Sequence, residues 1–253
     1  MCTLIAAFGV FPRWPLVVAA NRDEYLDRAS KPPLLWPEGL PFVAPRDEVA
    51  GGTWLGVNAR GLFVGVTNRF GAVRDASRSS RGKLVVEALG EPSARSLQLR
   101  LASLPAERFN PFHLFYADAK HAGISWFDGS KLHQQELAAG VHIVTERSLG
   151  GDDRARTELI RAEWQKAAGR EATIDSLAHL LRLHAADPIG GTCIHAPQLR
   201  YGTRSSTIVF LGSSLGTSQL WFADGHPCTS SYASQDALLR RLSEPISAPR
   251  AGP

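Results

Sequence analysis

Cysteine is scarce in this chain, with three residues among 253: Cys2, Cys193 and Cys228. An odd number at such wide spacing argues against the disulfide framework of a small secreted domain. No CxxC pair indicates structural zinc, and no CxxCH motif indicates covalently attached haem. The core must therefore form without cross-links, and a chain of this length can bury a sizeable one.

Long hydrophobic runs are also lacking. The first apolar run, Leu4 to Val10, is followed by Pro12, has no basic segment before it and is too short to span a bilayer. We identify neither a signal peptide nor a membrane helix, and we expect a cytoplasmic protein. Internal repeats and long Pro/Gly/Ser linkers are absent as well, so we predict one domain over residues 1–253, with a frayed tail from about residue 243.

The charge balance is basic, with 28 Lys and Arg against 24 Asp and Glu and a net charge of +4. The densest basic patch comprises Arg69, Arg74, Arg78, Arg81 and Lys83. A basic chain can bind nucleic acid, but no recognised motif occurs and aromatic residues are not interleaved with these arginines. We expect no nucleic-acid partner. The patch is either a solvated loop or a means of attracting an anionic small molecule.

The expected elements alternate between groups of strands and pairs of helices. Strand patterns cover residues 2–8, 16–20, 54–58, 62–67, 113–117, 123–127, 131–136, 141–145, 192–195, 206–211 and 219–223, with residues 113–145 read as one meander. Helical patterns cover residues 83–89, 94–104, 153–168, 174–181 and 234–242, and residues 28–46 and 70–80 are expected to be pocket loops. Hairpins interrupted by helices favour antiparallel sheets, and strands apolar on both faces need cover on both sides. We predict an α+β fold, a four-layer αββα sandwich of two mainly antiparallel sheets.

Cys2 stands directly behind the initiator methionine. Removal of Met1 gives an N-terminal cysteine whose thiol attacks while its own α-amine takes the proton. The ordinary pKa values, about 8.5 for the thiol and about 7.7–8.0 for the amine, lie close enough for that exchange. The alternative is that Cys2 begins a buried strand as a small hydrophobic residue.

The segment Asn21-Arg22-Asp23-Glu24 follows the second expected strand. In a hairpin the end of the second strand returns to the start of the first, which places Arg22 and Asp23 beside Cys2. An arginine near a thiol raises the thiolate fraction, and a carboxylate orients an α-amine. We predict that Cys2, Arg22 and Asp23 are catalytic; the alternative is a polar turn after a strand.

Further residues are candidates for contact with a substrate. The glycines before Trp54 either form a tight turn into a strand or allow close backbone approach and line an oxyanion site, with Trp54 in the core or in a pocket wall. Asn68 and Arg69 end a central strand. Arg204 precedes an apolar strand, where it binds either a ligand carboxylate or phosphate or a structural partner.

The histidines and the remaining cysteines give one candidate metal set. Cys193 and His195 are two residues apart, as are His226 and Cys228, and four such ligands can hold an ion if their strands are neighbours. The spacing is not a recognised zinc signature, so we expect no metal.

Taken together, the motifs resemble the NRDE family, the transport-and-Golgi-organisation type, second member. The resemblance rests on Met1-Cys2-Thr3, Asn21-Arg22-Asp23-Glu24, Gly51-Gly52-Thr53-Trp54-Leu55-Gly56, Val66-Thr67-Asn68-Arg69, Ser80-Arg81-Gly82 and Tyr201-Gly202-Thr203-Arg204-Ser205-Ser206-Thr207. It implies the N-terminal-nucleophile hydrolase fold, shared with penicillin acylases, bile-salt hydrolases and cysteine-type acid ceramidases. It also implies that Arg22 is the arginine beside the nucleophile and that Asp23, or else Glu24, is the accompanying carboxylate.

The chain departs from that family at Thr145-Glu146-Arg147, where members often carry Ser-Asn. A carboxylate at Glu146 repels a developing oxyanion, whereas an amide donates to it. Either backbone N–H groups or Asn68 replace that donor, or the chemistry differs.

The resemblance implies two functions. The first is a hydrolase or acyltransferase that acts on a non-peptide amide or related acyl bond of a small molecule through a Cys2 acyl-enzyme, without a cofactor. The alternative is a non-catalytic carrier of haem or of a lipid or acyl-CoA on the same fold. Haem in that case needs an apolar slot and an axial His or Cys.

Overall fold

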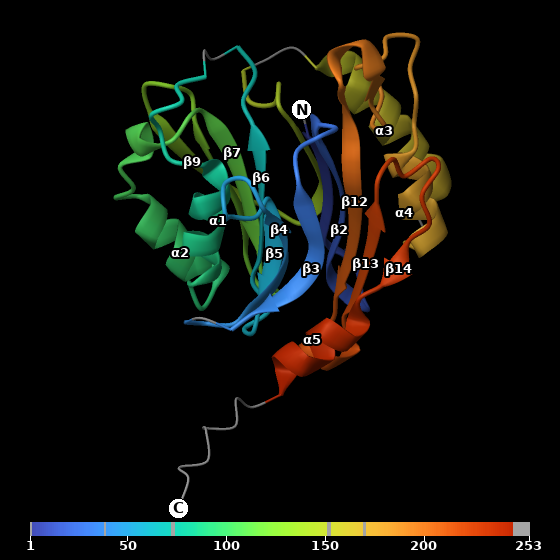
Figure 1. Ribbon diagram of the computed structural model, residues 1–253. Helices are drawn as coiled ribbons and strands as arrows, with labels where there is room; N and C mark the ends of the chain where they lie inside the picture. The colour runs from blue at the N-terminus through green and yellow to red at the C-terminus, as the bar shows by residue number, and fades with distance from the viewer. Residues whose placement is uncertain (1, 38, 72–73, 151–152, 169–170, 245–253) are drawn as a thin grey trace, which may run out of the picture.

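The structure is a computed structural model that describes residues 2–37, 39–71, 74–150, 153–168 and 171–244. Two sheets lie face to face, with one pair of helices outside each (Figure 1). The first sheet contains β1 (Cys2–Phe11), β2 (Trp14–Tyr25), β10 (Gly140–Thr145), β11 (His195–Ala196), β12 (Tyr201–Leu211), β13 (Gln219–Asp224) and β14 (Ala233–Ser234). Its order is β10-β1-β2-β12-β13-β14, and β11 pairs with β12.

The second sheet follows chain order from β3 to β9. Its strands are β3 (Ser30–Trp36), β4 (Phe42–Asp47), β5 (Leu55–Asn58), β6 (Phe63–Asn68), β7 (Phe112–Ala117), β8 (Ala122–Phe127) and β9 (Leu132–Leu137). The helices are α1 (Arg81–Leu89), α2 (Ala94–Leu101), α3 (Arg154–Ala167), α4 (Ile174–Leu181) and α5 (Asp236–Ser243). All the strand pairs are antiparallel, as the sequence predicts.

The alternation of side chains along each strand creates three cores. In β1, Leu4 and Ala6 face the second sheet, whereas Ile5 and Ala7 face α3 and α4. The strands of the second sheet divide in the same way between the inner core and the core under α1 and α2. Because successive strand residues point to opposite faces, a strand apolar on both faces requires two covering layers. The predicted four-layer sandwich is confirmed.

The interval 28–46, expected to be a loop, contains strands β3 and β4, so that prediction was wrong. Prolines at positions 32, 33, 37 and 41 conceal the strand pattern, because proline cannot donate to a sheet ladder. The sheet accommodates Pro32 and Pro33 because β3 is an edge strand whose register with β4 shifts between Lys31 and Leu34.

Two other predictions need correction. The meander over residues 113–145 ends at β9, because β10 crosses to the first sheet and pairs with β1. The strand expected over residues 192–195 is reduced to β11, since residues 192–194 lie in an irregular segment. The expected tail falls mostly on residues 245–253, outside the described residues.

Close backbone approach explains one glycine-rich motif. Gly52 lies against Gly82 at the start of α1, and Thr53 N–H donates to the Gly82 carbonyl oxygen at 3.3 Å. A Cβ atom at Gly52 would collide with that carbonyl group, so only glycine fits. The contact joins the segment between β4 and β5 to the N-terminus of α1, which Ser80 caps.

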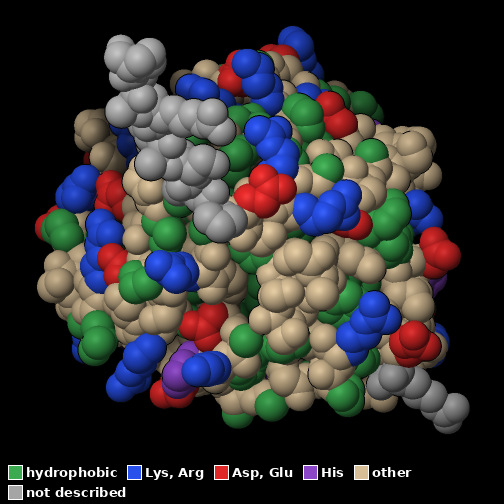
Figure 2. Space-filling view, turned by 90° about the horizontal axis from the view of Figure 1, so that it is seen from below, with side chains coloured by type: hydrophobic (Ala, Val, Ile, Leu, Met, Phe, Trp, Pro, Cys, Tyr) green, Lys and Arg blue, Asp and Glu red, His purple; other side chains and the backbone are tan. Residues whose placement is uncertain are grey.

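The two ends of the sandwich differ. At one end, α5 packs Leu239 and Leu242 into the core between the sheets. Figure 2, seen from that end, shows basic and acidic side chains interspersed with scattered hydrophobic ones. Among the described residues, no helix has the length and apolar character needed to cross a bilayer. The opposite end, where β1 begins, contains the candidate site (Figure 1).

Candidate functional site

The β1–β2 hairpin brings the predicted catalytic residues together. In its register Cys2 lies opposite Arg22, so Asp23 follows immediately beside the start of β1. The backbone N–H of Asp23 donates a hydrogen bond to the Cys2 thiol. The geometric part of the prediction, that the end of β2 returns to Cys2, therefore holds.

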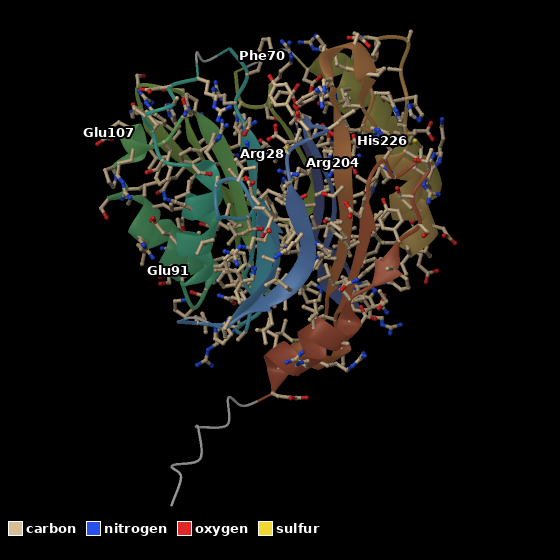
Figure 3. All side chains as sticks on the ribbon, in the orientation of Figure 1. Arg28, Phe70, Glu91, Glu107, Arg204 and His226 are labelled. Atoms are coloured by element: carbon tan, nitrogen blue, oxygen red, sulfur yellow. The ribbon has the colours of Figure 1, made fainter. Side chains whose placement is uncertain are left out.

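A pocket of about 520 Å³ opens beside Cys2. Seven of the nine predicted site residues line it: Cys2, Arg22, Asp23, Glu24, Trp54, Asn68 and Arg69. Its wall also includes Arg28, seen between the sheets near the start of β3 in Figure 3. Because both sheets and the segment before α1 contribute to the wall, the pocket is a property of the whole sandwich and not of one loop.

The Cys2 thiol has opposing electrostatic neighbours. Burial is the largest influence and raises the pKa of the Cys2 thiol, and the Asp23 carboxylate acts in the same direction. The Asp23 N–H and the Arg22 guanidinium lower that pKa by stabilising the thiolate. The thiolate at this position is therefore favoured by the Arg22 charge and the Asp23 N–H and opposed by burial and the Asp23 carboxylate, and the pKa of the thiol is raised on balance.

Arg22 is held without a carboxylate. Its guanidinium lies over the Trp54 ring, 4.2 Å from the ring centroid, and donates to Ser30 Oγ at 3.5 Å. In contrast, Arg28 is bound by Asp47 at 2.7 Å and by Glu24 at 3.7 Å. Within the described part of the chain no carboxylate forms an ion pair with Arg22, so its charge is available to the thiolate and to a ligand.

Asp23 is fully buried and has a specific donor. Thr203 Oγ1 donates to Asp23 Oδ1 at 2.6 Å, and the Tyr201 hydroxyl donates to the Asp23 carbonyl oxygen at 2.8 Å. Burial raises the pKa of the Asp23 carboxyl to about 6, although the Thr203 bond favours the charged form. The carboxyl group can therefore change its protonation state close to neutral pH, as a group that assists proton transfer must.

The opposite wall of the pocket is formed by the end of β6. The side-chain amide of Asn68 makes no hydrogen bond to any described residue, so it can donate to a ligand or to an oxyanion. Arg69 is fixed, because its guanidinium donates to the carbonyl oxygens of Ser148 at 3.3 Å and of Leu149 at 3.0 Å.

Two predicted substrate-binding residues lie outside the lining. Glu146 is 2 % exposed and pairs with Arg156 at 3.2 Å, so its charge is compensated. Arg204 is the extra residue where the register of β12 against β2 shifts between Thr203 and Ser205. Its charge acts on His226, which lies with it on the β12–β13 side of the molecule in Figure 3.

Sequence reasoning did not assign Arg28 and Arg81 to the site, although both line the pocket. Arg81 donates to the Pro111 carbonyl oxygen at 3.0 Å and, among the described residues, has no carboxylate partner. The motif Ser80-Arg81-Gly82 was available as a signal for it. Arg28 begins the interval 28–46 that was expected to be a pocket loop, but the residue itself was not singled out.

His113 was missed for a different reason. It is buried on β7, where Nδ1 is 3.1 Å from Thr67 Oγ1 and Nε2 is 2.8 Å from the Ser148 carbonyl oxygen. Burial, with the nearby Arg69 charge, lowers the pKa of His113 to about 4. The neutral ring supports the segment that holds Arg69, a role visible only once β6 and β7 are paired.

Comparisons with known proteins agree with this architecture. A model of the family described as Transport and Golgi organisation 2 matches residues 1–220. The chain belongs to this family. It is 25 % identical over 272 residues to the Transport and Golgi organization protein 2 homolog of Bos taurus, covering 89 % of this chain and 90 % of the bovine protein. The human homolog is 31 % identical over 129 residues, which cover 48 % of this chain and 47 % of the human protein.

Solved structures with a similar fold include a hydrolase and an acylase. The C2A mutant of conjugated bile acid hydrolase from Clostridium perfringens matches with a TM-score of 0.64 at 10 % identity, covering 96 % of this chain and 94 % of that one. Penicillin V acylase from Agrobacterium tumefaciens matches with a TM-score of 0.52 at 13 % identity, covering 94 % and 88 %. At such identities the likeness concerns the fold, which is that of the N-terminal-nucleophile hydrolases.

Proposed function

We propose that this family member is an N-terminal cysteine hydrolase or acyltransferase that cleaves a non-peptide amide, or a related acyl bond, of an anionic small molecule. The observation that carries the proposal is the placement of Cys2 opposite Arg22 in the β1–β2 register, with both residues lining the pocket. The names of the structural neighbours, a bile acid hydrolase and a penicillin acylase, support amide chemistry as the reaction class.

The chemistry begins with removal of Met1, which frees the α-amine of Cys2. The thiol sulfur attacks the carbonyl carbon while that amine accepts the thiol proton and then delivers it to the leaving amine. The acyl group remains on sulfur until water, or a second amine, releases it. In this scheme the Asp23 carboxyl orients the amine and Arg22 stabilises the thiolate.

The tetrahedral intermediate needs a donor for its oxyanion. Asn68 fits this role because it lines the pocket with an amide that is unused by the described protein groups. Glu146 does not oppose the reaction as its sequence position suggested, because it lies outside the lining and is paired with Arg156. The proposal therefore retains amide cleavage despite the departure from the family motif.

The charge of the pocket supports an anionic substrate. Six arginines line it against four acidic residues, and Arg28 and Arg78 are paired with Asp47 and Asp75. The other four, Arg22, Arg69, Arg74 and Arg81, have no carboxylate partner among the described residues. A carboxylate or phosphate on the substrate supplies that partner through charge-assisted hydrogen bonds.

A carrier function without chemistry is the alternative. The charged lining disfavours haem, which needs an apolar slot, and favours an acyl ligand with an anionic head group. The two functions differ in one respect: a carrier returns its ligand unchanged.

The test is to incubate the processed protein with N-acyl amides that carry a terminal carboxylate and to record its intact mass. We expect an acyl adduct that maps to Cys2 and a released amine. Cys2→Ala should form no adduct. A variant with lysine inserted between Met1 and Cys2 keeps the thiol but blocks Met1 removal, and it should also be inactive. Binding with no adduct and no released amine would instead support the carrier.

A further inference from the structure

A second group of reactive side chains lies on the first sheet, outside the pocket lining. His184 follows α4, Cys193 lies just before β11, His195 begins β11, and Cys228 lies in the turn between β13 and β14. One ligand atom from each residue falls within 4.8 Å of all the others. The set brings together three segments separated in sequence.

The three closest atoms form a nearly equilateral triangle. Cys193 Sγ is 3.4 Å from His195 Nε2 and 3.6 Å from Cys228 Sγ, and His195 Nε2 is 3.2 Å from Cys228 Sγ. Tetrahedral zinc with Zn–S bonds of about 2.3 Å and Zn–N bonds of about 2.0–2.1 Å separates its ligands by about 3.5–3.8 Å. The triangle therefore needs to expand by only a few tenths of an ångström to hold a zinc ion.

We propose that His184, Cys193, His195 and Cys228 bind one zinc ion. Two thiolates and two imidazoles are a typical set for this metal, and four protein ligands leave no position open for substrate, which makes the site structural. Binding releases the two thiol protons to solvent and changes no oxidation state. The sequence led us to expect no metal because the spacing is not a recognised zinc signature, and the candidate set then contained His226 in place of His184.

Contacts around the cluster hold its segments in place. Arg182 Nε donates to the Pro227 carbonyl oxygen at 2.8 Å, which joins the end of α4 to the turn that carries Cys228. The Leu183 carbonyl oxygen accepts from Cys193 N–H at 3.1 Å, which joins the two ends of the loop between α4 and β11. The cluster is thus assembled by ordinary hydrogen bonds, and a metal ion finds its ligands already close.

His226 packs against the cluster but is not one of its ligands. Its ring stacks on the ring of His195, with centroids 4.0 Å apart, but its nitrogens are not among the grouped ligand atoms. His184, by contrast, joins that group, with its ring centroid 5.2 Å from that of His195. The structure therefore distinguishes His184 as a ligand from His226 as a packing residue, which gives a matched pair for testing.

The cluster also connects to the strand that carries the pocket residues. Ile194, between Cys193 and His195, donates its N–H to Thr203 Oγ1 at 2.9 Å, and Thr203 donates to Asp23. The Asn21 amide donates to the Leu181 and Thr192 carbonyl oxygens at 2.9 and 2.7 Å, at the two ends of the loop that carries His184. A bound ion would brace this segment against β2.

The test is metal analysis of the full chain purified under reducing conditions and reconstituted with Zn²⁺, or with Co²⁺ as a spectroscopic probe. We expect one ion per chain and thiolate-to-cobalt charge-transfer bands. Cys228→Ser and His184→Gln should each weaken binding by at least about 100-fold. His226→Gln, Cys2→Ser and the distant His142→Gln should retain one ion per chain.

Three results would overturn the proposal. The first is a stoichiometry well below one ion per chain in a folded protein, with folding checked by circular dichroism. The second is an ion whose binding is unchanged by both Cys228→Ser and His184→Gln. The third is a Cys193–Cys228 disulfide that persists in protein purified under reducing conditions. It would show that the two sulfurs bond to each other and not to a metal ion. Because none of the measurements uses activity, failure here leaves the proposed function standing, and the reverse also holds.

Discussion

Two regions of the first sheet carry cysteine, and they differ in what surrounds the sulfur. Cys2 is a single thiol beside a guanidinium and a backbone donor, at the edge of a pocket of about 520 Å³. Cys193 and Cys228 face each other and His195 at 3.2–3.6 Å. We propose the first environment as that of a nucleophile and the second as a metal site. Neighbours in space, and not spacing along the chain, decide which chemistry a cysteine can perform.

The largest expected effect comes from removing the nucleophile. Cys2→Ala should reduce acyl transfer by about 10³-fold or more, because the covalent step has no substitute. The measurement is the single-turnover rate of amine release. The same variant should bind zinc normally, since Cys2 is not part of the cluster. Undiminished turnover in Cys2→Ala would show that Cys2 is not the nucleophile, and the proposed difference between the two cysteine regions would then be wrong.

Asp23→Asn should have the next largest effect on rate. We expect a loss of about 10²-fold in kcat, because an amide cannot hold the α-amine by charge during proton transfer. A KM close to that of the parent protein is expected, since the role proposed for Asp23 is to orient the Cys2 amine and not to bind substrate. A change confined to KM would place Asp23 among substrate contacts.

The same substitution should alter the pH dependence of stability. The pKa of Asp23 is raised by burial from 3.8 to about 6, so its stabilising contribution is complete below pH 3.8 and is lost as the pH rises through about 6. The difference corresponds to about 3 kcal/mol. Relative to the parent, Asp23→Asn should therefore gain stability between pH 4 and pH 8 in urea denaturation. A relative loss over that range would show that Asp23 is held as an anion.

Arg22→Gln should raise KM for a carboxylate-bearing amide by about 10- to 100-fold, the value of one charge-assisted hydrogen bond. The exposed Arg95, hydrogen-bonded only to Gln98 at 2.8 Å among the described groups, is a matched control. An uncharged amide should lose much less. Equal losses for both substrates would indicate that Arg22 acts on the thiol alone.

The smallest effect tests the link between the two regions. Asn21→Ala removes two buried hydrogen bonds to the loop that carries His184 and should destabilise the fold by about 2 kcal/mol. Asn58 makes the same two amide bonds in the other sheet, to the Leu89 and Glu91 carbonyl oxygens, and its oxygen also accepts from the Arg60 and Leu62 N–H groups, so Asn58→Ala is a control with a larger expected loss of stability. Both should lower stability, but only Asn21→Ala should weaken zinc binding.

The fold was readable from sequence where the pattern was local. Runs apolar on both faces predicted two covered sheets, and Thr173 marked the start of α4, where it forms a capping box with Ser176. The prolines of β3 hid a strand, because an edge position tolerates what an interior strand does not. The sequence could not predict that β10 joins the first sheet, because the apolar pattern of this strand fits either sheet equally well.

The site could likewise be predicted from the sequence only where it depends on neighbouring strands. A hairpin fixes its own register, so the meeting of Cys2 with Arg22 followed from two adjacent strands. Glu146 and Arg204 depended on distant pairings, and the structure places both outside the pocket lining. His184 was overlooked because it lies nine positions before Cys193, on a loop whose return to the sheet no local signal announces.

The most direct test of the central claim is intact-mass spectrometry with a limiting amount of a thiol-reactive probe, followed by peptide mapping. We expect the mass of a protein that lacks Met1, and we expect the probe to label Cys2 before Cys193 or Cys228. Retention of Met1, or a Cys2 that reacts no faster than the other two, would contradict the assignment of Cys2 as an N-terminal nucleophile.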